Sequence, residues 1–238
     1  MQTLDATIVL AFNGFARRSW GFDAFVLLLA ETALFKAGVL VALLWWTWER
    51  VGAKRPAPPV VLTLAGAVAA SATTRMLQNW LPARPRPLYD PALDAAGFVP
   101  PYTVPPDALR DWSSFPSDTA ALAFALATAV FLAHRGAGAF AYAWALFAVC
   151  LPRVYAGYHY PSDILCGAAI GLALMAAAAC SPVPPRVGAA AARWGRTHRG
   201  WFYAGLFLIT HQMATVFTDA RIWASFVARM LAAVWHGL

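Results

Sequence analysis

Charged side chains are scarce in this sequence. Asp, Glu, Lys and Arg make up 12% of its 238 residues, whereas hydrophobic residues make up 61%. Ordinary soluble domains carry roughly 25% charged residues, and a soluble fold of this size cannot bury so much apolar surface. The apolar residues also form runs long enough to cross a bilayer, which takes about 20 residues per crossing. The composition therefore excludes an ordinary soluble protein and predicts a single membrane-embedded domain over residues 1–238.

Cysteine is scarce as well. The three cysteines, Cys150, Cys166 and Cys180, lie in apolar stretches without metal-ligand spacing, so we expect neither a disulfide nor bound zinc. No cluster of metal ligands is visible in the sequence, and we expect no metal and no cofactor. The formal net charge is +7, but most Lys and Arg lie between apolar runs, and no basic stripe with interleaved aromatics occurs. Nucleic acid is therefore not an expected partner.

The apolar runs predict an all-α, polytopic membrane protein with six transmembrane helices. We place these spans at residues 21–48, 58–81, 117–134, 138–156, 161–181 and 201–236. Breakers separate them, namely Lys54-Arg55-Pro56, Arg135-Gly136 and the segment 182–185. The last run contains Asp219 and Arg221, so it bends or extends beyond the bilayer.

The first 19 residues predict a different kind of helix. Leu4, Ile8, Val9, Phe12 and Phe15 recur at helical spacing, while Asp5 and Asn13 interrupt the apolar pattern and Arg17-Arg18 ends it. This order of charges does not fit a cleavable signal peptide. The pattern favours an amphipathic helix in the membrane interface.

Basic residues between the spans predict the orientation of the chain. The connections after the first, third and fifth spans hold eight of them: Arg50, Lys54, Arg55, Arg135, Arg186, Arg193, Arg196 and Arg199. Cytoplasmic loops are enriched in Lys and Arg. We therefore expect both termini and the long connection 82–116 to face the periplasm of a bacterial inner membrane. The six basic residues on that side are Arg17, Arg18, Arg84, Arg86, Arg110 and Arg153, of which three belong to the motifs below.

The strongest motif joins the fourth and fifth spans. His159 and Asp163 are four residues apart, so they share one face at the first turn of a helix that begins near Pro161. A carboxylate there can accept a hydrogen bond from one ring nitrogen and leave the other free to attack. Arg153 adds a planar fork of donors suited to phosphate oxygens.

Two further motifs face the same side. The third and fifth spans both begin with Pro-Ser-Asp, at Pro116-Ser117-Asp118 and at Pro161-Ser162-Asp163. Helix starts present free N–H groups and attract anions, although Ser and Asp are also ordinary N-caps. Arg84 and Arg86 alternate with prolines, which hold the chain extended and present both guanidinium groups.

Together these motifs resemble the type 2 phosphatidic acid phosphatase family, which includes undecaprenyl pyrophosphate phosphatases. The likeness is specific at Arg86-Pro87, at Pro116-Ser117 and at Arg153, His159 and Asp163. It implies hydrolysis of a membrane lipid phosphate or diphosphate, with His159 forming a phosphohistidine. It also implies that Asp163 orients His159, while Arg86, Arg153 and Ser117 hold the phosphate oxygens.

The sequence departs from that family at two functional positions. Asn79 stands where the family has a lysine, and we expect Arg75, one turn earlier, to supply the missing charge. Asp118-Thr119 replaces Gly-His, and Thr cannot donate a proton near neutral pH. A diphosphate substrate needs little help from an acid, because its leaving group is a phosphate monoester with a second pKa of about 6. Undecaprenyl diphosphate is therefore the leading candidate substrate.

The predicted site has catalytic residues and phosphate-binding residues. The catalytic set is His159, Asp163 and Thr119, and the phosphate-binding set is Arg75, Arg84, Arg86, Arg153, Ser117 and Asp118. Two alternatives stay open. One is a phosphotransferase that passes the lipid phosphate to another acceptor, and the other is a weakened lipid-binding or lipid-translocating protein of the same fold.

Overall fold

All regular elements in the described part of the chain are helices. The computed structural model describes residues 2–52, 60–105, 107–181, 190, 193–220, 222–223, 226–227 and 230. The longer helices are α1 (Gln2–Asn13), α2 (Trp20–Glu31), α3 (Val39–Gly52), α4 (Val60–Trp80), α6 (Asp118–Ala133), α7 (Arg135–Trp144), α9 (Pro161–Cys180) and α11 (Arg199–Ala214). Shorter ones are α5 (Pro91–Ala95), α8 (Leu151–Tyr155), the 3-10 helix η2 (Pro87–Tyr89), and the π-helical segments η1 (Leu34–Gly38) and η3 (Ala145–Cys150). The expected all-α class is confirmed for these residues.

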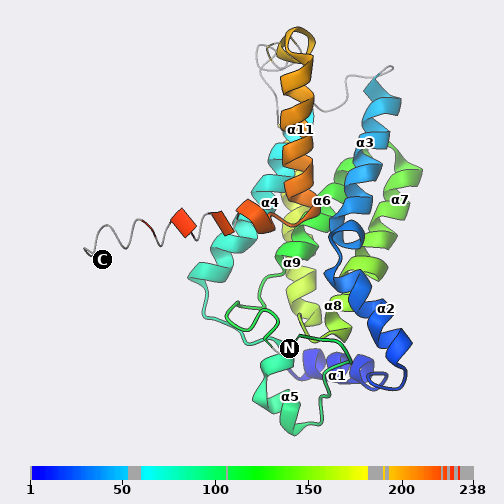
Figure 1. Cartoon of the computed structure of the whole chain (residues 1–238), viewed down its shortest axis with the longest axis vertical. Coiled ribbons are helices and arrows are strands. Elements are labelled where there is room, and N and C mark those ends of the chain that lie inside the picture. Colours follow the sequence, from blue (N-terminus) through cyan, green and yellow to red (C-terminus); the bar gives the residue numbers. More distant parts are fainter. Residues whose placement is uncertain are drawn as a thin grey trace.

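Helix α6 is the centre of the bundle. It packs against α3, α4, α7 and α9, and these upright helices surround it in Figure 1, with α1 and α5 at the lower end. Its alanine-rich sequence suits that place, because small side chains allow neighbouring helices to approach closely. Leu122 and Leu126 are fully buried on it and anchor the main hydrophobic core.

Two glycines bring α9 against the backbone of α6. A Cβ atom at Gly167 would lie 2.2 Å from the Ser117 carbonyl oxygen, and one at Gly171 would lie 2.2 Å from that of Ala121. Only glycine fits at such a contact, as in other small-residue helix interfaces. The close approach also joins the two helix starts, because the Ser117 N–H donates to the Asp163 carbonyl at 3.1 Å.

A helix is present at each of the six predicted spans, but not all of these helices have the length and hydropathy of a membrane crossing. Arg135–Tyr155 and Pro161–Cys180 do, and the pair Trp20–Glu31 and Leu34–Arg50, bent by 61°, is a third candidate. Helix α6 is shorter, with 16 residues. The structure therefore supports a helical membrane protein, and the crossing of all six spans stays a prediction.

The first and last predicted spans are interrupted. The run 21–48 bends after Glu31, where the π-helical segment η1 follows. Helix α11 ends at Ala214, before the predicted interruption at Asp219, and Val216 and Phe217 have positive φ angles of 54° and 55°. Positive φ is unusual for a β-branched residue such as Val.

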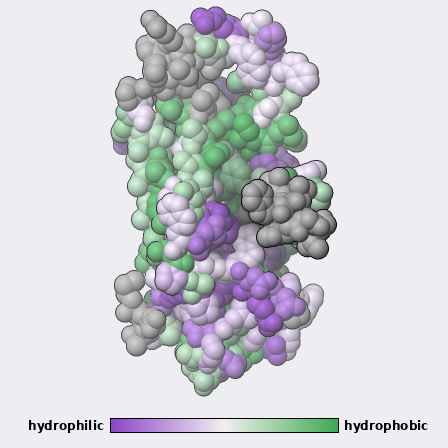
Figure 2. All heavy atoms as spheres, turned by 90° about the vertical axis from the view of Figure 1, so that its left-hand side faces the viewer, coloured by the Kyte–Doolittle hydropathy of each residue, from purple (hydrophilic) through white to green (hydrophobic). Residues whose placement is uncertain are grey.

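The surface in Figure 2 separates by polarity. Hydrophobic residues gather over the upper half of this face, and hydrophilic residues gather in its lower half and at the top. Such a band is expected where lipid tails surround a helical bundle. Lys54, Arg55, Arg186 and the segment 182–185, on which part of the orientation argument depends, lie outside the described residues.

Helix α1 is amphipathic, but its buried side carries polar residues and its exposed side carries apolar ones. Among its residues 4–13, the buried ones are Asp5, Val9 and Asn13, each four residues apart, whereas Leu4 is 64% exposed and Phe15, just after the helix, is 57% exposed. A buried stripe with two polar side chains shows that the helix faces polar groups of the protein. Its apolar outer residues agree with the predicted interfacial location, which stays a prediction.

Candidate active site

The three predicted motifs meet at one end of the bundle. The segment after α4 is held on two sides by backbone hydrogen bonds: Ser114 N–H donates to the Arg84 carbonyl and Leu88 N–H donates to the Gly157 carbonyl, each at 3.0 Å. These bonds fix the Arg-Pro segment beside the start of α9 and the loop before α6. The structure therefore brings together residues that are up to 79 positions apart in the chain, such as Arg84 and Asp163.

A glycine turn places His159 in the interior. Gly157 has φ +74°, a backbone conformation that favours glycine, and a Cβ atom there would also lie 2.7 Å from the Phe98 ring. The turn directs the following residues inward. Tyr158 is fully buried and the exposed fraction of His159 is 1%.

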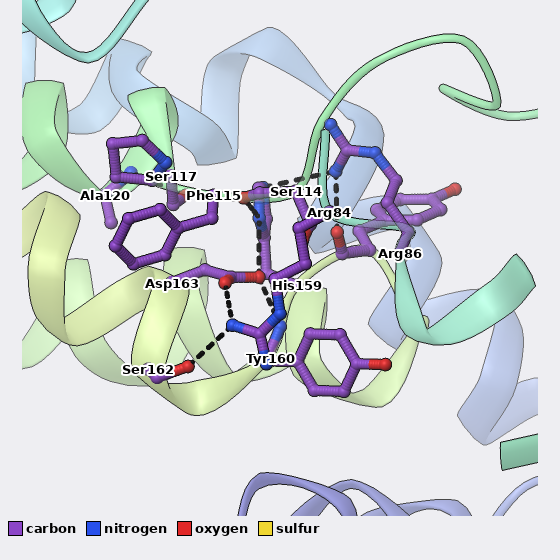
Figure 3. A network of polar contacts seen from close by, with 12 residues as sticks. Arg84, Arg86, Ser114, Phe115, Ser117, Ala120, His159, Tyr160, Ser162 and Asp163 are labelled. Carbon is purple, nitrogen blue, oxygen red and sulfur yellow. Dashed lines mark hydrogen bonds and ion pairs between the residues drawn. The ribbon is translucent and has the colours of Figure 1, made fainter. Parts of the chain in front are cut away.

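The hydrogen bonds of His159 determine its tautomer. Nδ1 lies 2.9 Å from the Ser114 carbonyl oxygen (Figure 3). A carbonyl can only accept, so Nδ1 carries the proton and the lone pair of the neutral ring is on Nε2. Nε2 lies 3.5 Å from Arg86 Nη1.

Asp163 is close to His159 without being its hydrogen-bond partner. Its Oδ2 lies 3.7 Å from Nδ1, beyond hydrogen-bond length, and accepts instead from the Tyr160 N–H at 2.7 Å. The expected orienting bond is therefore made by the Ser114 carbonyl in this structure, while Asp163 acts on the ring through its charge.

Burial lowers the pKa of His159 to about 4; Asp163 opposes this shift, and the charges of Arg86 and Arg153 add to it. The ring is neutral at pH 7.

Arg86 is a buried cation surrounded by carbonyl oxygens. Its Nη1 donates to the Tyr158 carbonyl at 2.6 Å, and its Nε donates to the carbonyls of Leu109 and Trp112 at 3.2 Å. Burial, and then the nearby charge of Arg153, lower the pKa of Arg86 to about 10, which still leaves it charged at neutral pH. Two cations buried close together favour the binding of an anion between them.

Arg153 strengthens that inference. Its Nη1 donates to the Ala30 carbonyl at 3.1 Å, and it is 8% exposed. Its Nε is buried and has no hydrogen-bond partner among the described residues. Buried donors are nearly always satisfied, so an unsatisfied N–H on this guanidinium marks a place where a ligand oxygen would fit.

Both arginines line a cavity of about 530 Å³. Its ionisable residues are four cations and two carboxylates: Lys36, Arg75, Arg86, Arg153, Glu31 and Asp118. Its apolar wall includes Leu109, Trp112, Val216 and Ile222. The surplus of positive charge next to apolar side chains suits a ligand with an anionic head and a hydrocarbon tail. Lys36, on the π-helical segment η1, was not among the predicted site residues.

Arg75 and Asp118 form an ion pair in this cavity. Arg75 Nη2 donates to Asp118 Oδ2 at 2.8 Å, and the guanidinium lies 4.2 Å from the centroid of the Trp112 ring. The Thr119 hydroxyl donates to Asp118 Oδ1 at 3.3 Å. Asn79 is exposed. Arg75 therefore reaches the cavity, as expected for a replacement of the family lysine.

Arg84 and Ser117, two predicted phosphate ligands, are engaged elsewhere. Arg84 does not line the cavity; it donates to Asp163 Oδ1 at 2.6 Å and to Asp5 Oδ2 at 2.8 Å. Ser117 is fully buried, and its Oγ accepts from the Ala120 N–H at 3.3 Å as the N-cap of α6. Arg86 has φ −76° and ψ 154°, close to polyproline II, where residues two apart point to different sides. The two arginines therefore diverge.

Besides Lys36, the predicted site residues did not include Asp5 or Ser114. Asp5 contacts Arg84 and Ser162, and Ser114 supplies the carbonyl that fixes His159. A carboxylate within an apolar N-terminal helix is a signal that could have found Asp5. No side-chain signal exists for Ser114, because it acts through its backbone.

Comparison with known proteins identifies the family. The model of the PAP2 superfamily matches residues 59–184, more than half of the chain, and the chain belongs to that superfamily, whose members are generally phosphatases. The predicted family is confirmed. A relative is the bacitracin transport permease protein BcrC of Bacillus licheniformis, 39% identical over 62 residues, which cover 25% of this chain and 29% of that protein. The chain therefore matches under a third of that relative's length. No solved structure matches.

Proposed function

We propose that this protein hydrolyses a membrane lipid diphosphate, with His159 as the nucleophile, on the periplasmic side of a bacterial inner membrane. The observation that carries the proposal is the tautomer of His159. Its Nδ1 proton is directed to the Ser114 carbonyl, and the Nε2 lone pair faces Arg86 beside a cavity with four cations. A neutral, fixed imidazole next to bound phosphate is suited to nucleophilic catalysis.

The reaction follows from these positions. Nε2 attacks the terminal phosphorus, the bond from phosphorus to the bridging oxygen breaks, and the lipid monophosphate leaves. Arg86 and Arg153 hold the non-bridging oxygens, exchanging part of their bonds to carbonyls for stronger charge-assisted ones. The ring becomes positively charged in the phosphohistidine, and Asp163 stabilises that charge at 3.7 Å. Water then attacks phosphorus and releases inorganic phosphate and the neutral His159.

The surroundings of Thr119 favour a diphosphate over a monophosphate. Its hydroxyl donates to Asp118, and Asp118 is paired with Arg75 at 2.8 Å. A carboxylate paired with a guanidinium is a poor proton donor, and so is a threonine hydroxyl. A lipid alkoxide needs a proton in order to leave, whereas a lipid monophosphate, with a second pKa of about 6, does not. A polyprenyl diphosphate such as undecaprenyl diphosphate fits both this chemistry and the apolar wall of the cavity.

The test compares kcat/KM for a polyprenyl diphosphate and the matching monophosphate, with purified protein and with EDTA present. We expect the wild type to prefer the diphosphate by at least about tenfold, since an acid contributes roughly 10²–10⁴-fold when it is needed. Thr119→His should raise monophosphate hydrolysis more than diphosphate hydrolysis. Thr119→Gln is the matched control, because glutamine is similar in size to histidine and cannot act as a general acid. A wild-type preference for the monophosphate would overturn this interpretation of Thr119.

A second candidate is a lipid-binding or lipid-translocating protein without turnover. Two observations favour it: the relative is named a transport permease, and Thr119 stands where the family has an acid. The same assay separates the candidates. Binding of the polyprenyl diphosphate without release of inorganic phosphate, in the wild type and in Thr119→His alike, would favour this second candidate.

A further inference from the structure

The N-terminal helix α1 reaches the site through a single carboxylate. Asp5 is 5% exposed. Its Oδ1 accepts from the Ser162 N–H at 3.0 Å, and its Oδ2 accepts from the Ser162 hydroxyl at 2.5 Å and from Arg84 Nη2 at 2.8 Å. Asp5 therefore satisfies a free N–H at the start of α9 and one side of the Arg84 fork.

The other side of that fork reaches Asp163. Arg84 Nη1 donates to Asp163 Oδ1 at 2.6 Å and to the Ser162 hydroxyl at 2.8 Å, and the guanidinium carbon lies 3.9 Å from the centroid of the Tyr160 ring. In Figure 3, Arg84, Ser162 and Asp163 form one connected network beside His159. A guanidinium held by two carboxylates and an aromatic ring has little freedom to move.

We propose that Asp5 and Arg84 are positioning residues that hold Asp163 for the reaction at His159, so that helix α1 is part of the catalytic apparatus. The proposal rests on the function proposed above. It assigns Arg84 to the support of Asp163 and not to the substrate phosphate.

The charges of the network explain why the chain needs both residues. Arg84 alone would neutralise Asp163 and weaken its attraction for the positively charged ring of the phosphohistidine. Asp5 also pairs with Arg84, so Asp5, Arg84 and Asp163 together have a net charge of −1. Burial raises the pKa of Asp5, but the hydrogen bonds from Arg84 and Ser162 outweigh burial and lower it overall. Asp5 is therefore ionised at neutral pH, and this balance is present when the enzyme works.

The direct test uses Asp5→Asn, Arg84→Gln and the double variant in the full chain, with the exposed Asp94→Asn on α5 as the control. We expect Asp5→Asn to lower kcat by roughly tenfold, as loss of outer hydrogen-bond partners does elsewhere, with KM for the polyprenyl diphosphate within about threefold of wild type. The double variant should be no slower than Arg84→Gln. A tenfold rise in KM with kcat unchanged in Arg84→Gln would make Arg84 a phosphate ligand and overturn the proposal.

The pKa of His159 provides a second measurement, and a variant that had lost its fold would not give the expected result. His159 faces Asp163 from α9, Arg86 from the segment after α4 and Arg153 from α8, and none of these changes in the variants. Asp5→Asn removes a negative charge and should move the titration of His159 to lower pH. Arg84→Gln removes a positive charge and should move it to higher pH. We expect the pKa of His159 to move by roughly 0.5 or more in each variant, in opposite directions. Movement in the same direction, or no movement, would contradict the proposal.

The titration is followed by NMR of ring-labelled histidine, assigned with His159→Gln, and does not need turnover. If the wild type hydrolyses no lipid phosphate, the proposed function fails, yet the opposite shifts still decide whether Asp5 and Arg84 act on His159. Asp5→Glu, which keeps the charge, serves where Asp5→Asn does not fold: it should titrate like the wild type, and a shift in the sense expected for Asp5→Asn would overturn the proposal.

Discussion

The same three residues, Pro-Ser-Asp, occur at the starts of α6 and α9, with Ser117 as the N-cap of α6 and Pro161 as the first residue of α9. The two helix starts also have different surroundings. At α9, Asp163 is fully buried, and its oxygens accept from the Tyr160 N–H and from Arg84. At α6, the side chain of Asp118 is 14% exposed and pairs with Arg75 at the edge of the cavity. One carboxylate is enclosed beside His159, and the other lines the cavity.

The difference arises from what covers each helix start. Helix α1 lies over the start of α9 and contributes Asp5, which bonds to Ser162. At the start of α6, Ser117 is buried and caps the helix itself, and Thr119 lines the cavity. The same local sequence therefore lies beside His159 at one helix start and lines the cavity at the other, and long-range contacts decide which.

We expect the largest effect from substitution of His159, which lies just before α9 and is the proposed nucleophile. His159→Gln keeps a side-chain donor for the Ser114 carbonyl and removes the attacking nitrogen. We expect turnover of the polyprenyl diphosphate to fall by roughly 10⁴-fold or more, as for removal of other enzyme nucleophiles. The measurements are release of inorganic phosphate and trapping of phosphorylated protein from a labelled substrate, with elution in size-exclusion chromatography as the folding control. Activity within tenfold of wild type would refute the assignment of His159.

The next effect compares the two carboxylates directly. Asp163→Asn removes the charge that stabilises the positively charged ring, and by analogy with the orienting carboxylate of a serine protease triad we expect kcat to fall by about 10²–10⁴-fold. Asp118→Asn releases Arg75 without changing the nucleophile, so we expect a change in KM and a kcat within about tenfold. Equal losses of kcat in the two variants would show that the two helix starts do not differ in function.

The features of the two helix starts that depend on nearby residues could be predicted from the sequence. Pro-Ser-Asp marked the starts of α6 and α9 to within one residue, because proline and capping side chains act within a single turn. The motif with Arg153, His159 and Asp163 pointed to the right family. These signals lie within one segment each, and they need no knowledge of the rest of the fold.

What the sequence left open depends on contacts between distant segments. Arg84 and Arg86 look equivalent in the sequence, and their different directions become visible only when Asp5 and the Tyr158 carbonyl are in place. The carbonyl that orients His159 belongs to Ser114, 45 residues away. Backbone groups leave no mark in the side-chain pattern, so neither contact follows from spacing or composition.

The smallest expected effect concerns the two serines at these helix starts. Ser117 Oγ accepts from the Ala120 N–H as the N-cap of α6, and loss of an N-cap costs about 1 kcal/mol. We expect Ser117→Ala to lower the apparent melting temperature in detergent by roughly 2–4 °C, with KM for the polyprenyl diphosphate nearly unchanged. Ser162 is not the N-cap of α9, and its hydroxyl bridges Asp5 and Arg84. We therefore expect the main effect of Ser162→Ala to be on kcat and not on the melting temperature. If Ser117→Ala instead raises KM tenfold at an unchanged melting temperature, Ser117 binds the phosphate and the start of α6 is closer to the chemistry than its capping geometry implies.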